Sequence, residues 1–447
     1  MIYMTYRQAI SYIYSLEEER INLGLSRIKS LLTLLQISPE VLKVIHIAGT
    51  NGKGSVAEMV SNILAYSGYK VGVYTSPHLK DFRERIVIKR FIARKDSIDR
   101  ELIPEKKLVA LVREIKPLVE RIARTKAGRP TFFEVTTAIM FAYFIREKVD
   151  FAVIEVGLGG RLDATNVVSP LVSVITNIGL EHTDRLGKTL RKIAREKCGI
   201  IKRESTVVTA DCNPEVLGVI RKVCSQKKAR LIRVRKFAGR IFTPAVRFYK
   251  FRHFHARQQS FDYYGSKYRL KGLAIPLMGE YQLANASCAI AALECVDSLR
   301  LTPGIIRKGL RYAKWPARLE VLRKAPFIIA DGAHNPPAAR MLKKAIEKYF
   351  KYENLILVIG ILNDKDAKGI LGCFLPLASK VILTRPFSPR ASIPFNLASL
   401  LPPVFHSDIF IIPDPAEGLK YAVDIAGRND LVLVTGSLYL AGAILKK

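Results

Sequence analysis

The stretch VIHIAGTNGKGS, residues 44–55, decides the class of fold that this sequence adopts. Its first five residues are apolar apart from His46, and they indicate a buried strand. A turn containing Gly49 and Gly52 follows, and we expect a helix to begin near Val56. A strand that leads through a glycine-rich turn into a helix is the first half of a parallel α/β unit.

The same turn carries the chemistry for binding phosphate. Glycine N–H groups converge on phosphate oxygens, the start of a helix adds positive potential, and Lys53 supplies a point charge. The pattern is not the common GxxxxGK[ST] form, because Ile47 stands at the first glycine position and Gly54 separates Lys53 from Ser55. The Ser55 hydroxyl can still reach a magnesium ion on the phosphates. A mere tight turn is the alternative, but strand, turn, lysine and helix in that order favour a nucleotide site. We expect the phosphates to be bound by Gly49, Thr50, Asn51, Gly52, Lys53, Gly54 and Ser55.

Similar apolar runs recur along the chain, separated by amphipathic stretches, which is the pattern of a parallel sheet with helices on its faces. The sequence therefore predicts an α/β protein. Its N-terminal domain would be P-loop-type, with a mostly parallel sheet and helices on both faces, and its smaller C-terminal domain would be Rossmann-like. We expect the boundary near residue 314, which gives domains 1–314 and 315–447. The further runs are KVGVYTS, FAVIEVG and LVSVITNIG, and then FIIADGAHN, NLILVIGIL, KVILTRP and DLVLVTGS.

Two polar residues lie at the edge of the predicted sheet where parallel strands end and ligands bind. Glu155 ends the strand FAVIE, and His182 follows the run VSVITNIGLE. Together they can complete the shell of a divalent ion beside the phosphates, although each alone is more often a capping or surface group. The glycines of GLGG, residues 157–160, do not form a dinucleotide fingerprint, because Leu162 stands where GxGxxG needs its third glycine.

Composition excludes several classes of protein. The chain has 447 residues, 49% of them hydrophobic, which is too long for one ordinary domain and too apolar for disorder. The N-terminus lacks the layout of a secretory signal, and the apolar stretch 432–445 is shorter than the ~20 residues of a membrane-spanning helix. The cysteines occur singly, so neither a structural zinc nor a disulfide framework is expected. We expect a cytoplasmic protein.

The charge is strongly positive and unevenly distributed. The net charge is +33, and residues 221–271 contain 16 Lys and Arg against the single acid Asp262. This basic aromatic stretch, residues 221–271, also holds ten Phe and Tyr, and basic groups beside stacking rings bind single-stranded nucleic acid. We favour a plainer interpretation, in which two or three strands have a solvated basic face and aromatic residues packed inward, because no nucleic-acid motif accompanies the charge.

Eight motifs in order resemble those of the folylpolyglutamate synthase and dihydrofolate synthase family, within the Mur ligase superfamily. They span nearly the whole chain. They are AGTNGKGS (48–55), TSPHLKDFRERI (75–86), EVGLGGRLDATN (155–166), TNIGLEHTDRLG (176–187), IAREKCGIIK (193–202), GEYQLANA (279–286), WPARLE (315–320) and DGAHNP (331–336).

The resemblance implies ATP-dependent amide formation in folate biosynthesis and one-carbon metabolism. A carboxylate would be phosphorylated to an acyl phosphate, and the amine of L-glutamate would displace the phosphate. Lys53 would bind the β- and γ-phosphates, while Ser55, Glu155 and His182 match magnesium ligands. Lys197 matches a lysine that is carbamylated in the family and then binds a second Mg²⁺; an ordinary surface lysine is the alternative.

The resemblance assigns the remaining matched residues to two binding sites, one for the nucleotide and one for the pterin. Those on the nucleotide side are Asn285, Arg318, Asp331 and His334. Those that would line the pterin pocket are Thr131, Phe133, Asp163 and Ala164. An aromatic face would stack on the flat ring and a carboxylate would accept two N–H bonds from its edge, although Phe133 could equally belong to the core. The sequence departs from the family pattern at Ala317, where many relatives carry Gly.

Three hypotheses follow. The first is a folate ligase that adds glutamate to dihydropteroate, to folates, or to both. We expect it to be a monomer without a membrane partner and with at most weak, non-specific affinity for nucleic acid. The second is another Mur-type ligase with a different acid substrate. The third is a nucleic-acid-binding protein on an inactive ligase scaffold, which only the charge favours. A basic cleft would also attract ATP, glutamate and polyglutamate tails, all of them anionic.

Overall fold

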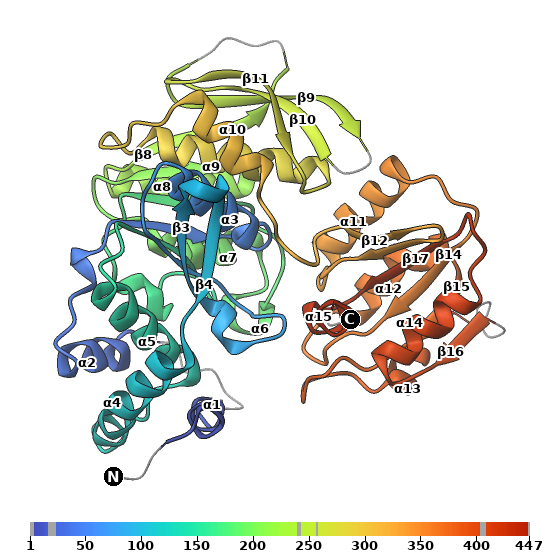
Figure 1. Ribbon diagram of the computed structural model, residues 1–447, viewed down its shortest axis with the longest axis horizontal. Coiled ribbons are helices and arrows are strands. Elements are labelled where there is room, and N and C mark those ends of the chain that lie inside the picture. Colours follow the sequence, from blue (N-terminus) through green and yellow to red (C-terminus); the bar gives the residue numbers. More distant parts are fainter. Residues whose placement is uncertain (1–3, 17–23, 239–242, 256–257, 403–407, 446–447) are drawn as a thin grey trace. The chain divides into compact units, whose positions relative to one another are not determined.

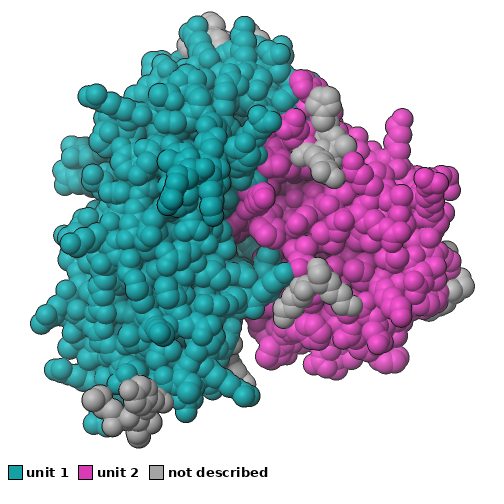
Figure 2. Space-filling view, viewed as in Figure 1, with its two compact units in different colours: residues 1–252, 260–274, 283–313 teal, residues 253–259, 275–282, 314–447 magenta. Residues whose placement is uncertain are grey.

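The computed structural model describes residues 4–16, 24–238, 243–255, 258–402 and 408–445. The chain divides into two compact units (Figure 2). The first unit holds residues 1–252, 260–274 and 283–313. The second holds residues 314–447 together with the short segments 253–259 and 275–282.

The first unit is built on an 11-stranded sheet with the order β11-β10-β9-β8-β7-β6-β1-β5-β2-β3-β4 (Figure 1). In this spatial order, the seven neighbouring strands β9-β8-β7-β6-β1-β5-β2 are parallel to one another. Beyond β2, strands β3 and β4 are added in antiparallel pairings. The strands are β1 (Val44–Ala48), β2 (Val71–Tyr74), β3 (Ile86–Ile92), β4 (Ser97–Leu102), β5 (Phe151–Glu155), β6 (Val172–Ile175), β7 (Thr206–Thr209), β8 (Arg230–Lys236), β9 (Val246–His255), β10 (Gln258–Tyr264) and β11 (Arg269–Ile275).

Helices cover both faces of this sheet. Val44, Ala152 and Ile154 belong to a core that they share with α2, α4 and α5. Because side chains alternate along a strand, their neighbours point to the other face, where α3 packs on β1, β2 and β5. The helices are α1 (Tyr6–Tyr14), α2 (Ser26–Leu34), α3 (Lys53–Tyr66), α4 (Glu105–Ala123), α5 (Phe132–Arg146), α6 (Thr183–Leu186), α7 (Leu190–Lys197), α8 (Pro214–Gln226), α9 (Glu280–Glu294) and α10 (Pro303–Arg311).

The second unit has a six-stranded sheet with the order β12-β13-β17-β14-β15-β16. Only the pair β12–β13 is antiparallel among its pairings. Its strands are β12 (Glu320–Lys324), β13 (Phe327–Ala330), β14 (Leu355–Ile359), β15 (Ala378–Leu383), β16 (Ile409–Ile411) and β17 (Leu431–Thr435). Its helices are α11 (Pro336–Tyr349), α12 (Ala367–Phe374), α13 (Pro394–Ala398), α14 (Pro415–Asp424) and α15 (Leu438–Ile444).

These two sheets confirm the predicted α/β fold, with a large, mostly parallel N-terminal sheet and a smaller C-terminal one. The start of α3 was predicted wrongly. The helix begins at Lys53 and not near Val56, because Gly52 adopts the left-handed conformation (φ 88°) and turns the chain into the helix at once. Lys53 therefore lies in the first turn of α3.

In the part of the chain that the structure describes, no helix combines the length and the apolar character needed to span a bilayer. The six cysteines are free thiols.

Candidate active site

The glycine-rich turn after β1 lies in close contact with two distant segments. A Cβ on Gly49 would stand 1.9 Å from the Thr176 hydroxyl oxygen, and one on Gly52 would stand 2.6 Å from Oδ1 of Asn285. Side chains are excluded at both positions, so the backbone can approach a ligand. The predicted nucleotide residue Asn285, on α9, is thus brought against the glycine-rich loop.

The segment that follows β6 supports the loop through hydrogen bonds. The N–H groups of Thr50 and Asn51 donate to the backbone oxygen and to Oδ1 of Asn177, at 2.8 and 2.9 Å. The Thr176 hydroxyl donates to the carbonyl of Asn51 at 2.7 Å. Thr176 and Asn177 belong to the motif at residues 176–187, but the sequence did not identify them as site residues. Their position at the end of a strand beside β1 was the available signal, because neighbouring parallel strands end at one edge.

Lys53 folds back over the loop. Its Nζ donates to the carbonyls of Gly49 (3.0 Å) and Thr50 (3.1 Å) and lies 3.9 Å from Oε1 of Glu155. Glu155 is the last residue of β5 and is almost completely buried. The ammonium group therefore lies over the carbonyls of the glycine-rich loop, next to a buried carboxylate.

Lys197 contacts the same Gly49 carbonyl. It ends α7, it is buried, and its Nζ donates to the oxygen of Gly49 at 2.8 Å. Burial first, and then the charge of Lys53, lower the pKa of Lys197 to about 7. An ordinary surface lysine is therefore excluded, and two lysines share one loop carbonyl. Burial favours the neutral amine, the form that is nucleophilic.

His182 lies in the segment that follows β6 and precedes α6. Its backbone is left-handed (φ 49°, ψ 44°), a conformation that costs most residues energy and that occurs often at functional sites. Its Nε2 lies 3.9 Å from Oε1 of Glu181. Among the described residues there is no group of three or more His, Cys, Asp or Glu suited to a metal. Of the residues predicted to bind magnesium, only Glu155 and His182 are of these four types. Ser55 and oxygen atoms of the phosphates would have to complete the coordination. This fits the preference of Mg²⁺ for few protein ligands.

The residues predicted to line the pterin pocket have structural contacts of their own. Thr131 caps α5 by accepting from the N–H of Glu134. The ring of Phe133 lies against Gly157, where a Cβ would approach it to 2.3 Å. Asp163 is buried and accepts from the N–H groups of Leu158 (2.8 Å) and Thr165 (3.0 Å), and burial raises its pKa.

The structure thus brings Phe133 and Asp163 to one turn, residues 157–158. Ala164 is buried next to Asp163 at the start of a short 3-10 helix. Each carboxylate oxygen of Asp163 already accepts a bond, which organises the turn; a bond to pterin would have to use the remaining lone pairs. The pterin contacts therefore stay a prediction.

In the second unit, Asp331 organises two neighbouring segments. Its carboxylate accepts from the N–H groups of Leu319 (2.7 Å) and Ala333 (2.8 Å). Burial raises the pKa of Asp331, and the Arg318 guanidinium opposes that shift. Nδ1 of His334 donates to the carbonyl of Gly332 at 2.8 Å. Asp331 thus holds the backbone beside both Arg318 and His334.

The backbone of the turn around Arg318 shows why glycine suits position 317, where this chain carries Ala317. Ala317 and Leu319 both have positive φ, 56° and 48°, and Ala317 is fully buried. A left-handed backbone is one that glycine adopts without strain, whereas an L side chain there costs roughly 1–2 kcal/mol. The glycine of the family pattern is thus the residue that the backbone favours here.

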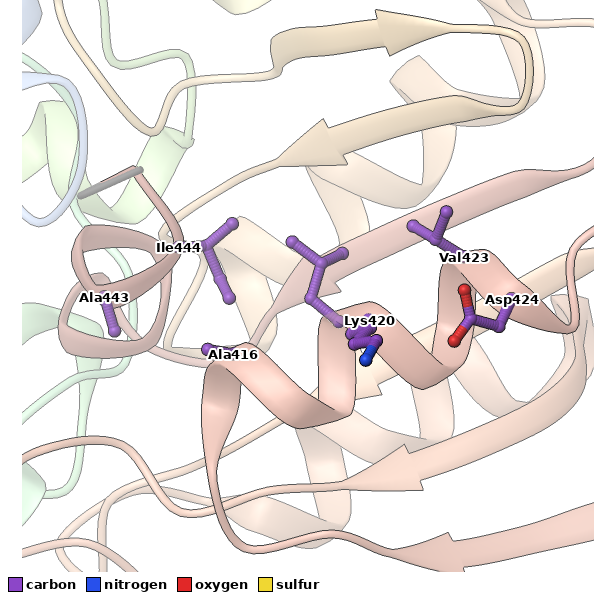
Figure 3. A pocket seen from close by; sticks show the side chains of 7 residues that line it. Ala416, Lys420, Val423, Asp424, Ala443 and Ile444 are labelled. Atoms are coloured by element: carbon purple, nitrogen blue, oxygen red, sulfur yellow. The ribbon is translucent and has the colours of Figure 1, made fainter.

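A surface hollow in the second unit contains none of these residues. It lies between α14 and α15 (Figure 3). Its lining is mostly aliphatic, with one charge of each sign, and it offers no group for the predicted chemistry. The lining residues are Ala416, Leu419, Lys420, Val423, Asp424, Ala443 and Ile444.

Comparison with known proteins places this geometry in a family. Residues 47–293 match the Mur ligase middle domain, and residues 317–438 match the glutamate ligase domain of Mur ligases. The dihydrofolate synthase/folylpolyglutamate synthase of Bacillus subtilis (strain 168) is 34% identical over 452 residues, covering 100% of both chains.

Solved structures agree with this assignment. Folylpolyglutamate synthase from Thermotoga maritima superposes with a TM-score of 0.82 at 37% identity, covering 99% of this chain and 96% of the other. Escherichia coli FolC, solved in complex with DHPP and ADP, superposes with a TM-score of 0.84 at 30% identity, covering 99% and 97%. These full-length similarities show that the chain belongs to the folylpolyglutamate synthase and dihydrofolate synthase family of Mur ligases.

Proposed function

We propose that this protein joins the amine of L-glutamate to the carboxylate of a folate or of dihydropteroate, with ATP as the energy source. The carboxylate oxygen attacks the γ-phosphorus of ATP, which gives an acyl phosphate and ADP. The glutamate amine then attacks the acyl carbon, loses a proton and displaces inorganic phosphate. The observation that carries the proposal is the pair Lys53 and Lys197 on the carbonyl of Gly49, beside buried Glu155.

The residues of the first unit provide the phosphate chemistry. Loop N–H groups, the start of α3 and the Lys53 ammonium neutralise charge that develops on the transferred phosphoryl group, which is most of what such a reaction requires from a protein. Ser55, Glu155 and His182 would hold magnesium, which supplies further neutralisation when bound. Asn285, in contact with Gly52, would orient the nucleotide.

The buried amine of Lys197 supports the carbamate that the family resemblance implies. A neutral amine adds to CO₂ and loses one proton, which converts the uncharged amine into an anionic carbamate whose oxygen atoms would be ligands for a second magnesium. We propose that domain 1–314 binds ATP and the pterin substrate and that domain 315–447 acts on glutamate. We also propose that Arg318 and His334 reach the phosphates of ATP. We also propose a cytoplasmic monomer without a membrane partner.

Product analysis tests the proposed function directly. The purified protein would be incubated with ATP, magnesium, L-glutamate and either dihydropteroate or tetrahydrofolate, and the products identified by mass spectrometry. Glutamylated pterin in either reaction supports the proposal. ATP consumption with other acids but with neither pterin would assign the chain to a different Mur-type substrate.

Replacing Glu155 with Gln or His182 with Ala should raise the magnesium concentration needed for half-maximal activity and lower turnover. Each change removes one ligand from a cation held mainly by oxygen atoms. Initial rates measured against magnesium concentration test this. If both variants keep the magnesium dependence of the wild type, the metal site lies elsewhere.

Lys197→Ala should abolish most activity, and short carboxylic acids added to the buffer should restore part of it, because they can supply the missing anionic oxygen. The intact mass of the wild-type protein should contain one additional CO₂. Lys192→Ala, an exposed position on the same helix, is the control and should keep full activity. Full activity of Lys197→Ala, together with a bare amine in the active wild type, would contradict the carbamate.

A further inference from the structure

Strands β8 and β9 carry basic side chains on one face, which continues onto β10, and the proposed ligase chemistry does not use them. Arg247 on β9 points to α9, where its Nε donates to Glu294 at 2.8 Å. Since side chains alternate along a strand, Phe248, Lys250 and Arg252 point to the opposite face. Lys250 and Arg252 are exposed there, so that face is open to solvent.

Strand β8 adds two arginines to the same face. Its register with β9 pairs Arg233 with Val246 and Arg235 with Phe248, and both arginines are half-buried. A third guanidinium, Arg221 on α8, is close enough to act on Arg233. Burial first, and then the charges of Arg235 and Arg221, lower the pKa of Arg233.

These three guanidiniums have no carboxylate within ion-pair distance among the residues that the structure describes. The Nε of Arg233 is buried and has no hydrogen-bond partner there. The acid on this face, Asp262, already pairs with Arg252 and accepts from the N–H of Gly272. Because an arginine in a protein keeps its proton, the repulsion within the cluster is best relieved by an anion from outside.

Aromatic rings lie next to the cluster. The ring of Phe237 contacts those of Phe248 (5.9 Å between centroids) and Tyr264 (5.7 Å). Phe248 is almost fully buried, whereas Phe237 and Tyr264 are half-buried and reach the surface. Guanidiniums beside accessible rings suit a ligand that presents phosphates and flat bases together.

The cluster is separate from the phosphate loop. Paired residues on neighbouring strands lead from the loop to the cluster: Ala48 on β1 pairs with Ile175 on β6, Ile175 pairs with Thr209 on β7, and Thr209 pairs with Arg233 on β8. Arg233 is therefore three strands from the start of the loop, roughly 14 Å at the usual strand spacing. A ligand on the β8–β10 face need not enter the nucleotide site.

We propose that this face, formed by Arg221, Arg233, Arg235, Lys250, Phe237 and Tyr264, binds single-stranded nucleic acid. The arginines and lysine neutralise phosphates, and the two rings stack on bases. Because neither kind of contact reads base edges, binding is weak, salt-sensitive and independent of sequence. Phe242 and Arg257, which belong to the same basic aromatic stretch, lie outside the described residues.

Fluorescence anisotropy of labelled oligothymidine and oligouridine, each about 15 nucleotides long, tests the proposal on the full chain. Saturating MgADP blocks the nucleotide site. The variant R233Q/R235Q/K250Q is compared with K106Q/R113Q/R124Q, which removes three exposed charges on α4 and at its end. Both variants change the net charge equally.

The wild type should bind both oligomers, with an affinity that falls as salt rises. The R233Q/R235Q/K250Q variant should lose about 10-fold or more in affinity at low salt. Its slope of log affinity against log salt should become shallower by about 2, the value for three phosphate contacts on a single strand. The α4 variant should bind like the wild type. Phe237→Leu, which keeps an apolar side chain over Phe248, should weaken binding about 5-fold or more through lost stacking.

Other outcomes overturn the proposal. Equal losses in both triple variants would show that total charge, and not this face, attracts the oligomer. Absence of binding at low salt, or tighter binding of a duplex of the same sequence, would exclude a single-strand site. Displacement by a poly-γ-glutamate peptide at lower concentration than by oligothymidine would assign the face to carboxylate chains. The R233Q/R235Q/K250Q variant should keep folate ligation, so this result is independent of the proposed ligase activity.

Discussion

Lys53→Ala should reduce ligation by about 10²–10³-fold or more, the loss seen when one preorganised charge-stabilising group is removed from an active site. Nζ of Lys53 contacts two loop carbonyls and lies near Glu155, and its side chain packs into no hydrophobic core. The fold should therefore persist. Steady-state formation of glutamylated product, with the melting temperature of the same sample, measures both effects.

Lys188→Ala is the matched control for Lys53→Ala, because Lys188 is exposed in the segment between α6 and α7. It should keep normal turnover. Near-normal turnover of Lys53→Ala would show that the turn after β1 is not the phosphate site. A large fall in melting temperature would instead assign Lys53 a structural role.

Glu294→Ala should destabilise the first unit by about 3–5 kcal/mol, because it leaves the Arg247 charge buried without a partner. Both side chains are essentially inaccessible, 2% and 0% exposed. Glu294 also accepts from the Tyr263 hydroxyl (3.0 Å) and from the N–H groups of Lys267 (3.2 Å) and Tyr268 (3.0 Å). One carboxylate therefore anchors β9, β10 and the turn before β11 to α9.

Denaturant unfolding, followed by a probe in the first unit, measures this loss. Glu114→Ala is the control: Glu114 pairs with Arg146 on the surface, and its removal should cost at most about 1 kcal/mol. The double variant R247M/E294L should recover much of the stability, since apolar residues can replace a buried ion pair. A loss for Glu294→Ala as small as that for Glu114→Ala would contradict the anchoring role.

Local pattern was enough to predict several parts of the site. The turn at residues 49–55, Glu155 at the end of its strand and His182 beyond the run LVSVI could be located because strand ends and glycine turns are properties of short stretches. The first turn of α3 was missed, because the helix starts at Gly52 through a left-handed backbone angle that residue spacing does not reveal. The pterin residues matched a motif, yet Asp163 already bonds to the N–H groups of Leu158 and Thr165.

By itself, the sequence determined the α/β class, the mostly parallel sheet of the first unit and the place of Lys53 next to the glycine-rich turn, since these follow from periodicity and from adjacent residues. Only the tertiary structure decided which groups meet. Asn285 reaches Gly52, Lys197 is buried against Gly49, and Arg247 is neutralised by Glu294. Each of these contacts joins elements far apart in the chain. Burial in such contacts also decides the charge state of a side chain, because desolvation depends on packing around the group and not on its neighbours in sequence.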